Sequence, residues 1–157
     1  GRRIGAFGWS MGGAVALMTA ARDARVGAVV ADSAFADQGS VIAFNFQQST
    51  RLPAWPFVPL AFAFIRMRAG YWPQRVRPVD AIGDIAPRPV LLIHGERDDM
   101  CPAEHARRLL HAAGATTTHL WMAPSAKHVG AYFADPAAYV ARVAEFFHRS
   151  LGVENML

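Results

Sequence analysis

Residues 8–12 read Gly-Trp-Ser-Met-Gly and stand between a short apolar run, residues 4–7, and an alanine-rich run, residues 11–21. The two runs predict a strand and a helix, so Ser10 would lie on the turn that joins them. On such a tight turn the serine backbone is strained and its neighbours are crowded, and flanking glycines relieve the contact. The turn presents the Ser10 hydroxyl as a nucleophile, and the helix behind it would direct the Met11 amide at an oxyanion.

A serine hydroxyl needs a general base, and the base needs a carboxylate that orients it. Residues 90–93 read Val-Leu-Leu-Ile, which predicts a buried strand, and the acidic loop 94–102 follows them. Residues 116–122 are β-branched and aromatic, which predicts a final strand, and the loop 123–130 behind it contains His128. In a strand–helix enzyme with the serine first, the acid follows a later strand and the histidine follows the last one.

Four segments in this order resemble the α/β-hydrolase superfamily, in particular its prolyl-oligopeptidase-like and serine-aminopeptidase-like branches. They are GWSMGG at 8–13, DSAF at 32–35, RPVLLIHGERDDMCP at 88–102 and KHVGAY at 127–132. The resemblance implies a serine hydrolase that cleaves an ester, thioester or peptide bond through an acyl-serine intermediate. Its His-Gly-x-x-Asp-x-x-x-Pro pattern makes Asp98 the acid, and its histidine loop makes His128 the base, with Ser10 as nucleophile.

The acid and the histidine have alternatives. Asp99 is the neighbouring candidate acid, and its structural role would be to cap the following helix. Asp32 ends a predicted strand where some hydrolases carry their acid, and otherwise it would line a pocket or cap a helix. His94 is predicted to be a hydrogen-bonded structural residue, and Cys101 is assigned no catalysis. The other histidines are predicted to be ordinary surface or packed residues: His105, His111, His119 and His148.

The elements that must position these residues alternate between strand and helix, which predicts an α/β fold with a mostly parallel sheet and helices on both faces. The predicted strands are 4–7, 26–31, 90–93 and 116–122. The predicted helices are 11–21, 37–48 capped by Asp37, one that runs from Pro102 to Gly114, and one that begins at Asp135-Pro136.

The resemblance implies further strands ahead of the serine, and these N-terminal strands are absent from the chain. The strand at residues 4–7 has the apolar composition of a buried strand, yet it would lie at an edge of the sheet. The helix at residues 11–21 is apolar nearly all round, which predicts that it packs deep in the protein. The same absence leaves the second oxyanion donor undefined. The alternative to an enzyme is therefore a catalytically incomplete fold fragment or a non-catalytic binding domain.

Residues 52–70 are rich in Pro, Trp and Phe and depart from the strand–helix alternation. The resemblance places a cap over the active site here. The chain is accordingly predicted to be one partial α/β-hydrolase domain, residues 1–157, in which residues 37–75 form a cap or lid insertion.

Aromatic side chains of this insertion would line an apolar substrate pocket together with Trp9, which precedes the nucleophile. The alternatives are that they bury against the helix at residues 37–48 or that they touch a membrane surface. The residues predicted to bind substrate are Trp9, Trp55, Phe57 and Phe62.

The chain of 157 residues has a net charge of +4 and its basic residues are spread from end to end, unlike the concentrated charge of a nucleic-acid binder. It contains neither a metal-ligand spacing nor a phosphate-binding loop, so we expect no metal and no cofactor. The expected partner is a small-molecule or peptide substrate; membrane contact has no support and the oligomeric state is open. The single cysteine and the lack of a targeting segment favour the cytoplasm without determining the compartment.

Overall fold

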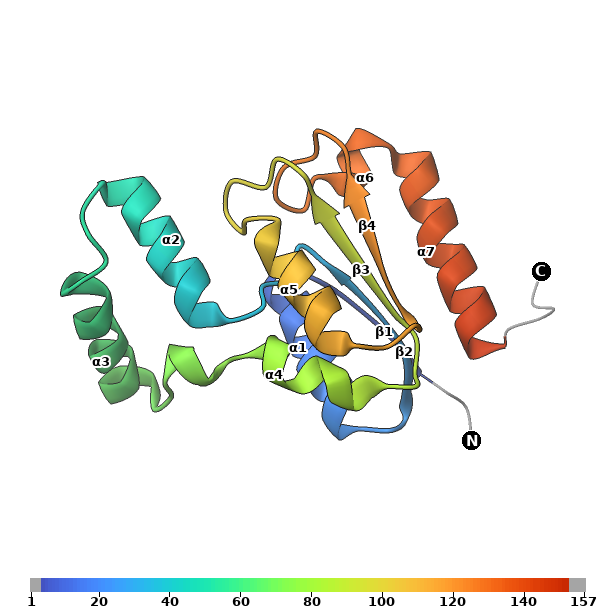
Figure 1. The fold of residues 1–157 in the computed structure, drawn as a ribbon, viewed down its shortest axis with the longest axis horizontal. Coiled ribbons are helices and arrows are strands. Elements are labelled where there is room, and N and C mark those ends of the chain that lie inside the picture. The colour runs from blue at the N-terminus through green and yellow to red at the C-terminus, as the bar shows by residue number, and fades with distance from the viewer. Residues whose placement is uncertain (1–3, 153–157) are drawn as a thin grey trace. The chain divides into compact units, whose positions relative to one another are not determined.

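Four parallel strands form one β-sheet in the computed structural model, which describes residues 4–152. Their order in this part of the chain is β1-β2-β3-β4 (Figure 1). The strands are β1 (Ile4–Trp9), β2 (Val26–Asp32), β3 (Val90–Gly95) and β4 (Thr118–Ala123). The α-helices are α1 (Met11–Arg22), α2 (Gln38–Thr50), α3 (Phe57–Ala69), α4 (Pro78–Ala81), α5 (Glu104–Ala113), α6 (Ala131–Ala134) and α7 (Pro136–Leu151). Two short 3₁₀ helices are η1 (Pro73–Arg75) and η2 (Ile82–Ile85).

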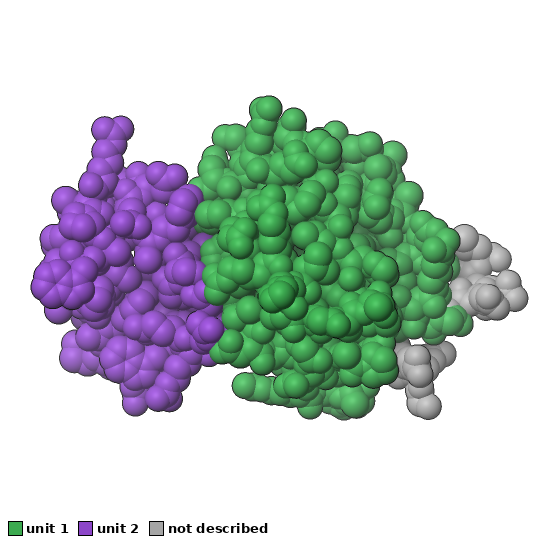
Figure 2. All heavy atoms as spheres, in the orientation of Figure 1, with its two compact units in different colours: residues 1–36, 78–157 green, residues 37–77 purple. Residues whose placement is uncertain are grey.

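The chain divides into two compact units, coloured separately in Figure 2. Unit 1 comprises residues 1–36 and 78–157 and contains the described sheet, while unit 2 comprises residues 37–77. Unit 2 consists of α2, α3, η1 and their connections. Its bounds lie close to those of the expected insertion, residues 37–75, whose role as a cap stays a prediction.

Unit 2 is organised by its own contacts. Asp37 caps α2 as predicted, because its carboxylate accepts a hydrogen bond from the Ser40 amide at 2.7 Å. The ring of Phe46 on α2 lies 5.9 Å from the ring of Phe57 at the start of α3, centroid to centroid. The two helices thus share an aromatic contact within the unit.

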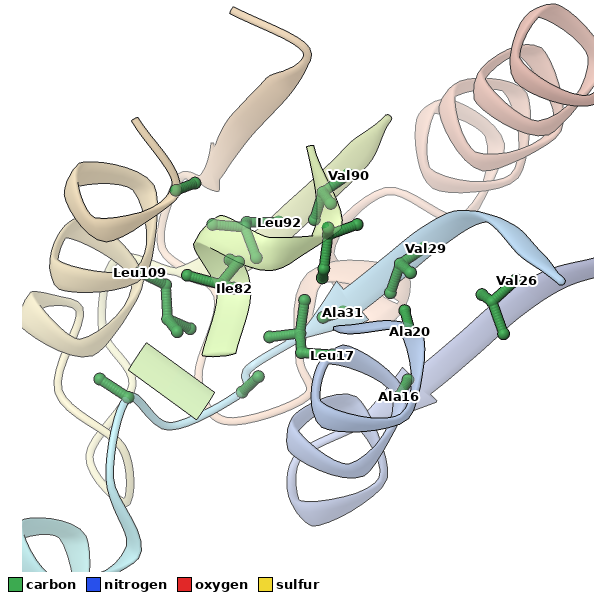
Figure 3. Packing of buried hydrophobic residues seen from close by; sticks show 14 residues of the cluster. Ala16, Leu17, Ala20, Val26, Val29, Ala31, Ile82, Val90, Leu92 and Leu109 are labelled. Carbon is green, nitrogen blue, oxygen red and sulfur yellow. The ribbon is translucent and has the colours of Figure 1, made fainter. Parts of the chain in front are cut away.

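Both faces of the sheet are covered by helices. Successive side chains of a strand point to opposite faces, so each face carries its own cluster of buried residues. One cluster joins the sheet to α1, η2 and α5 and includes Leu17, Val29, Ile82, Leu92 and Leu109 (Figure 3). The other joins it to α6 and α7 and includes Val30, Leu91, Ile93, Ala131 and Tyr139. Burial of each large aliphatic side chain contributes about 1.5–3 kcal/mol. The predicted fold class, a mostly parallel sheet with helices on both faces, is confirmed.

β1 and α1 are less buried than their composition predicts. Within residues 4–152, β1 pairs with β2 alone and is an edge strand, as expected, with Ile4 53% and Trp9 52% exposed. α1 buries one side against the sheet, whereas Met11 and Val15 on its other side are exposed. The prediction of a deeply packed helix is therefore wrong for the described structure. Its apolar outer side has no neighbouring layer in this part of the chain.

The start of α5 also differs from the prediction. The helix begins at Glu104 with Ala103 at its N-cap, so Pro102 precedes the helix and does not open it. Asp99, expected to cap this helix, instead forms an ion pair with Lys127, with Nζ 3.2 Å from Oδ2. The residues before the helix are held by the carboxylate of Asp98, which accepts hydrogen bonds from the amides of Met100 and Cys101. The His105 amide binds the Pro102 carbonyl, one residue later than a helix beginning at Pro102 requires.

Candidate active site

Ser10 lies on the turn between β1 and α1 in a strained backbone conformation, with φ 49° and ψ −118°. A non-glycine residue rarely has positive φ, so neighbouring structure must hold it there. The Ser10 amide donates a hydrogen bond to the carbonyl of Asp32, 2.8 Å away at the end of β2. Strand pairing thus continues as far as the serine, and the predicted sharp turn is present.

The two glycines that flank the turn differ in what they contribute. A Cβ atom on Gly8 would overlap the carbonyl group of Gly12 and lie 2.6 Å from the Gly13 nitrogen. A Cβ atom on Gly12 would have no described atom within 4 Å. The expectation that both flanking glycines relieve crowding therefore holds for Gly8 and is wrong for Gly12. Gly13 is the second tight position, since its Cβ would lie 3.0 Å from the Gly8 carbonyl oxygen.

We expect Gly8→Ala to lower the free energy of unfolding by about 1–3 kcal/mol, because the new methyl group must displace backbone atoms. Gly12→Ala is the matched control, and its effect should stay within about 1 kcal/mol because alanine fits an open helical position. Urea denaturation of both variants beside the wild type measures the difference. Equal losses of stability in the two variants would contradict this account of the turn.

Three side chains from separate loops meet at the carboxyl ends of the strands. The Ser10 hydroxyl lies 2.9 Å from Nε2 of His128, and Nδ1 of His128 lies 2.8 Å from Oδ2 of Asp98. In the tautomer that satisfies both contacts, Ser10 Oγ–H donates to Nε2 and Nδ1–H donates to the carboxylate. The structure therefore brings together the three residues predicted as nucleophile, acid and base.

Asp98 is held in its ionised form by its surroundings. Its side chain is completely buried, which by itself would raise the pKa, but hydrogen bonds outweigh the burial and the pKa lies below its ordinary value. The donors are His128 to Oδ2 and the amides of Met100, at 3.0 Å, and Cys101, at 2.7 Å, to Oδ1. An acceptor with fixed donors on both oxygens can orient an imidazole without turning.

His128 is a stronger base than a free histidine. The hydrogen bond to Asp98 raises its pKa above the ordinary value, and partial burial opposes that rise. The imidazole side chain is 15% exposed, so its Nε2 edge remains near the surface beside Ser10. A base with these contacts can accept the serine proton and carry the resulting charge next to a carboxylate.

Asp99 and His94, the alternative candidates for the acid and the histidine, make other contacts. Asp99 pairs with Lys127 and not with His128. His94 is buried, its Nε2 donates to the carbonyl of Cys101 at 2.7 Å, and it lies 3.3 Å from Oδ2 of Asp98. The prediction of a structural, hydrogen-bonded histidine is confirmed. Cys101 is buried, and its amide donates to the carboxylate of Asp98.

Asp32 has a different role from those predicted for it. Asp98, not Asp32, accepts the Nδ1 hydrogen bond of His128. The Asp32 carboxylate is completely buried and binds the hydroxyls of Ser33 and Tyr139, so it caps no helix. The sequence pattern singled out Asp32 at the end of its strand, but it gave no signal for Tyr139, a residue of α7.

The residues predicted to contact the reacting group or the substrate lie in both units. Met11 is the first residue of α1, where backbone amides have no partner within the helix. The Trp9 indole packs edge-on against Phe7 at 4.9 Å and is about half exposed. Unit 2 holds the others: Phe62 is buried, Phe57 contacts Phe46, and Trp55 is 77% exposed. Their roles at the site stay predictions.

Across residues 4–152, none of the helices has both the length and the apolar character that crossing a membrane requires. The same residues contain no group of three or more His, Cys, Asp or Glu side chains arranged to hold a metal ion.

The architecture matches solved α/β-hydrolases. An esterase from Pyrococcus furiosus, Pf2001, superposes with a TM-score of 0.70 and 25% identity, over 96% of this chain and 55% of that one. The acylaminoacyl peptidase of Pyrococcus horikoshii superposes with a TM-score of 0.71 over 99% of this chain and 25% of that one. At 18% identity, the second match shows the fold alone.

Sequence comparison identifies the family. An uncharacterized protein of Bacillus subtilis, YqkD, is 34% identical over 145 residues, which are 91% of this chain and 47% of that protein. The chain thus spans about half the length of this curated relative. The sequence model of the prolyl oligopeptidase family matches residues 1–154, nearly the whole chain. With this match, the parallel sheet and the esterase and peptidase neighbours, the chain is an α/β-hydrolase and belongs to the prolyl oligopeptidase family.

Proposed function

We propose that this chain carries the catalytic triad of a serine hydrolase that cleaves an ester, thioester or peptide bond through an acyl-serine intermediate. Ser10 Oγ attacks the scissile carbonyl carbon while His128 Nε2 takes its proton. His128 then gives the proton to the leaving group, and water hydrolyses the acyl-serine in the second half of the reaction. Asp98 keeps Nδ1 protonated and stabilises the imidazolium that forms.

The observation that carries the proposal is the continuous line of hydrogen bonds from Ser10 through His128 to Asp98. Its two contacts, 2.9 and 2.8 Å, fall within the range in which a proton can pass between the groups. The strained serine backbone is a second support, because strain of this kind concentrates at functional positions. The Met11 amide at the start of α1 is the proposed oxyanion donor.

The proposal covers ester, thioester and peptide bonds as one class of scissile bond. An esterase and an acylaminoacyl peptidase are both among the structural neighbours, and both chemistries pass through an acyl-enzyme on a triad. We further propose that Trp9, which is half exposed beside the nucleophile, contributes an apolar wall to the substrate pocket. The substrate-binding role of Trp55, Phe57 and Phe62 in unit 2 is proposed from the sequence alone.

Labelling by an alkyl fluorophosphonate tests the proposal on the intact protein. We expect a covalent adduct on Ser10, because the serine is activated by its contact with His128. Ser10→Ala should abolish the adduct and His128→Ala should weaken it. The control is Ser49→Ala, which removes an exposed serine of α2 and should leave the label unchanged. A wild-type protein that takes up no label would refute the hydrolase and favour a non-catalytic domain.

A further inference from the structure

The buried carboxylate of Asp32, at the end of β2, binds one hydroxyl group on each of its oxygens. Ser33 Oγ–H donates to Oδ1 at 2.9 Å, and Tyr139 Oη–H donates to Oδ2 at 2.8 Å. The residue has no exposed surface. A buried ionisable group is costly unless it is hydrogen-bonded, so these two contacts are what make the position tolerable.

Each hydroxyl also accepts a hydrogen bond, and the two donors are neighbours of the catalytic residues. The Val129 amide donates to Ser33 Oγ at 3.0 Å, and Trp9 Nε1–H donates to Tyr139 Oη at 3.2 Å. Val129 directly follows the histidine in the chain, and Trp9 directly precedes the nucleophile. A single carboxylate therefore connects, through two hydroxyls, to both sides of the Ser–His contact.

The directions of these bonds favour an ionised Asp32. Ser33 and Tyr139 each have one hydroxyl hydrogen, and in each case Asp32 accepts it. An ionised carboxylate accepts on both oxygens and has no hydrogen of its own to place, which suits two hydroxyl donors. Burial raises the pKa of Asp32 above its ordinary value, and the hydrogen bonds from Tyr139 and Ser33 offset only part of that rise.

Backbone strain in the histidine loop gives the Ser33 contact a function. Val129 has φ 55°, and a β-branched residue in this region is rare because its side chain crowds the backbone. Ser33 has φ 53°, which is also unusual for a residue other than glycine. Such conformations persist only where surrounding contacts fix them. The hydrogen bond from Val129 to Ser33 is a contact of this kind, and it acts on the residue beside His128.

We propose that Asp32 is a positioning residue for the catalytic histidine. It orients the Ser33 hydroxyl so that the hydroxyl can hold the Val129 amide, and this contact keeps the imidazole of His128 on Ser10. It also orients the Tyr139 hydroxyl to receive the Trp9 indole, on the other side of the nucleophile. This inference rests on the proposed serine hydrolase function. It assigns the site a second carboxylate besides Asp98, and this second carboxylate does not touch the reacting atoms.

The charge of Asp32 gives the proposal a second, electrostatic consequence. The carboxylates that raise the pKa of His128 are Asp98, in direct contact, then Asp32 and Asp99. Asp99 is partly neutralised by Lys127, while His94 lies 3.3 Å from the same Oδ2 of Asp98 that binds His128 and acts on Asp32 as well. Removing the Asp32 charge should therefore lower the pKa of His128, provided that Asp98 stays in place.

The test measures the rate constant for modification of Ser10 by an alkyl fluorophosphonate, as a function of pH, in the intact protein. In this reaction an Oγ–P bond forms, the P–F bond breaks, fluoride leaves and His128 takes the serine proton, so no natural substrate is needed. The rate rises with pH as His128 loses its proton. We expect Asp32→Asn to slow the reaction by about tenfold or more, because an amide cannot accept both hydroxyls, and to move this rise to lower pH.

Two more variants separate position from charge. Ser33→Ala removes the acceptor for Val129 but keeps the carboxylate, so we expect a slower reaction with a smaller displacement in pH than in Asp32→Asn. Tyr139→Phe removes the hydroxyl that links Asp32 to Trp9 and leaves the contacts of Ser33 in place, so it should slow the reaction less than Ser33→Ala. Asp84→Asn removes an exposed carboxylate of η2 and is the control, with the wild-type rate and pH dependence expected.

The outcomes are distinct. If the wild type is labelled and Asp32→Asn keeps its rate constant and pH dependence, the inference is overturned while the serine hydrolase stands. A variant that labels a smaller fraction of the protein at the wild-type rate has only lost folded molecules, which also overturns it. If Asp32→Asn does not fold, wild-type rate constants in Ser33→Ala and Tyr139→Phe overturn it. A wild type that is not labelled at any pH refutes the proposed function itself.

Discussion

Asp98→Asn is expected to lower kcat by about ten-thousandfold, whereas Asp99→Asn should leave kcat within about twofold of the wild type. The asparagine side chain fits the same space, and its oxygen can still accept the two amides that now bind Oδ1. Its nitrogen would then face Nδ1 of His128 and donate to it. The imidazole must accept there, so its hydrogen moves to Nε2, and Nε2 can no longer take the proton of the serine.

The neighbouring residue is the matched control, because it differs in environment and not in chemistry. The Asp99 side chain is 58% exposed and pairs with Lys127 on the surface, where an ion pair contributes little. Steady-state hydrolysis of a short-chain acyl ester by the intact protein measures kcat for both variants. Comparable losses in the two, or a larger loss in Asp99→Asn, would refute the assignment of the acid.

The pH dependence of kcat/KM gives an independent check on the same variant. Asp98 raises the pKa of His128, and in the proposed mechanism the neutral imidazole is the active form, so we expect the wild-type rate to fall as pH drops through this raised pKa. In Asp98→Asn the raising charge is gone, and the fall should move to lower pH although the plateau is far lower. An unchanged position of the fall would mean that Asp98 does not act on His128.

The sequence predicted Ser10, Asp98 and His128 as one site because their order along the chain decides where they lie. A serine on a strand–helix turn, an acid after a later strand and a histidine after the last one must meet, because parallel strands end at the same edge of the sheet. Short local patterns also sufficed for Asp37 and Asp135, whose carboxylates accept amides of the first helical turn at 2.7 and 3.0 Å.

What the sequence did not predict depends on contacts between distant segments. Tyr139 lies 107 residues from Asp32 along the chain, and its place on the apolar side of α7 gives no hint that its hydroxyl binds a carboxylate. The start of α5 was misplaced because the Cys101 carbonyl, which would accept the first bond of a helix beginning at Pro102, binds His94, while the His105 amide binds the Pro102 carbonyl. The Gly-x-Ser-x-Gly spacing predicts crowding at both flanking glycines. In the structure only Gly8 of the two is crowded, by the backbone of Gly12 and Gly13.

Ser10→Ala and His128→Ala should each lower kcat/KM by about a millionfold, and the double variant should lose little more than either single variant. In the proposed mechanism Ser10 and His128 act in one step: without the imidazole the hydroxyl is not activated, and without the hydroxyl the imidazole has no proton to take. Their contact at 2.9 Å in the structure makes this coupling direct. If the two residues contributed independently, the fold losses in kcat/KM of the two single variants would multiply in the double variant.

The measurement is kcat/KM for a short-chain acyl ester in the wild type, the two single variants and the double variant, with His111→Ala as an exposed-histidine control expected to match the wild type. Residual activity in the double variant should exceed the uncatalysed rate by about a thousandfold or more, since an oxyanion donor and substrate binding remain. Multiplicative losses would show that Ser10 and His128 work separately. A single variant with wild-type activity would remove that residue from the triad, and the hydrogen bond between them would then be structural.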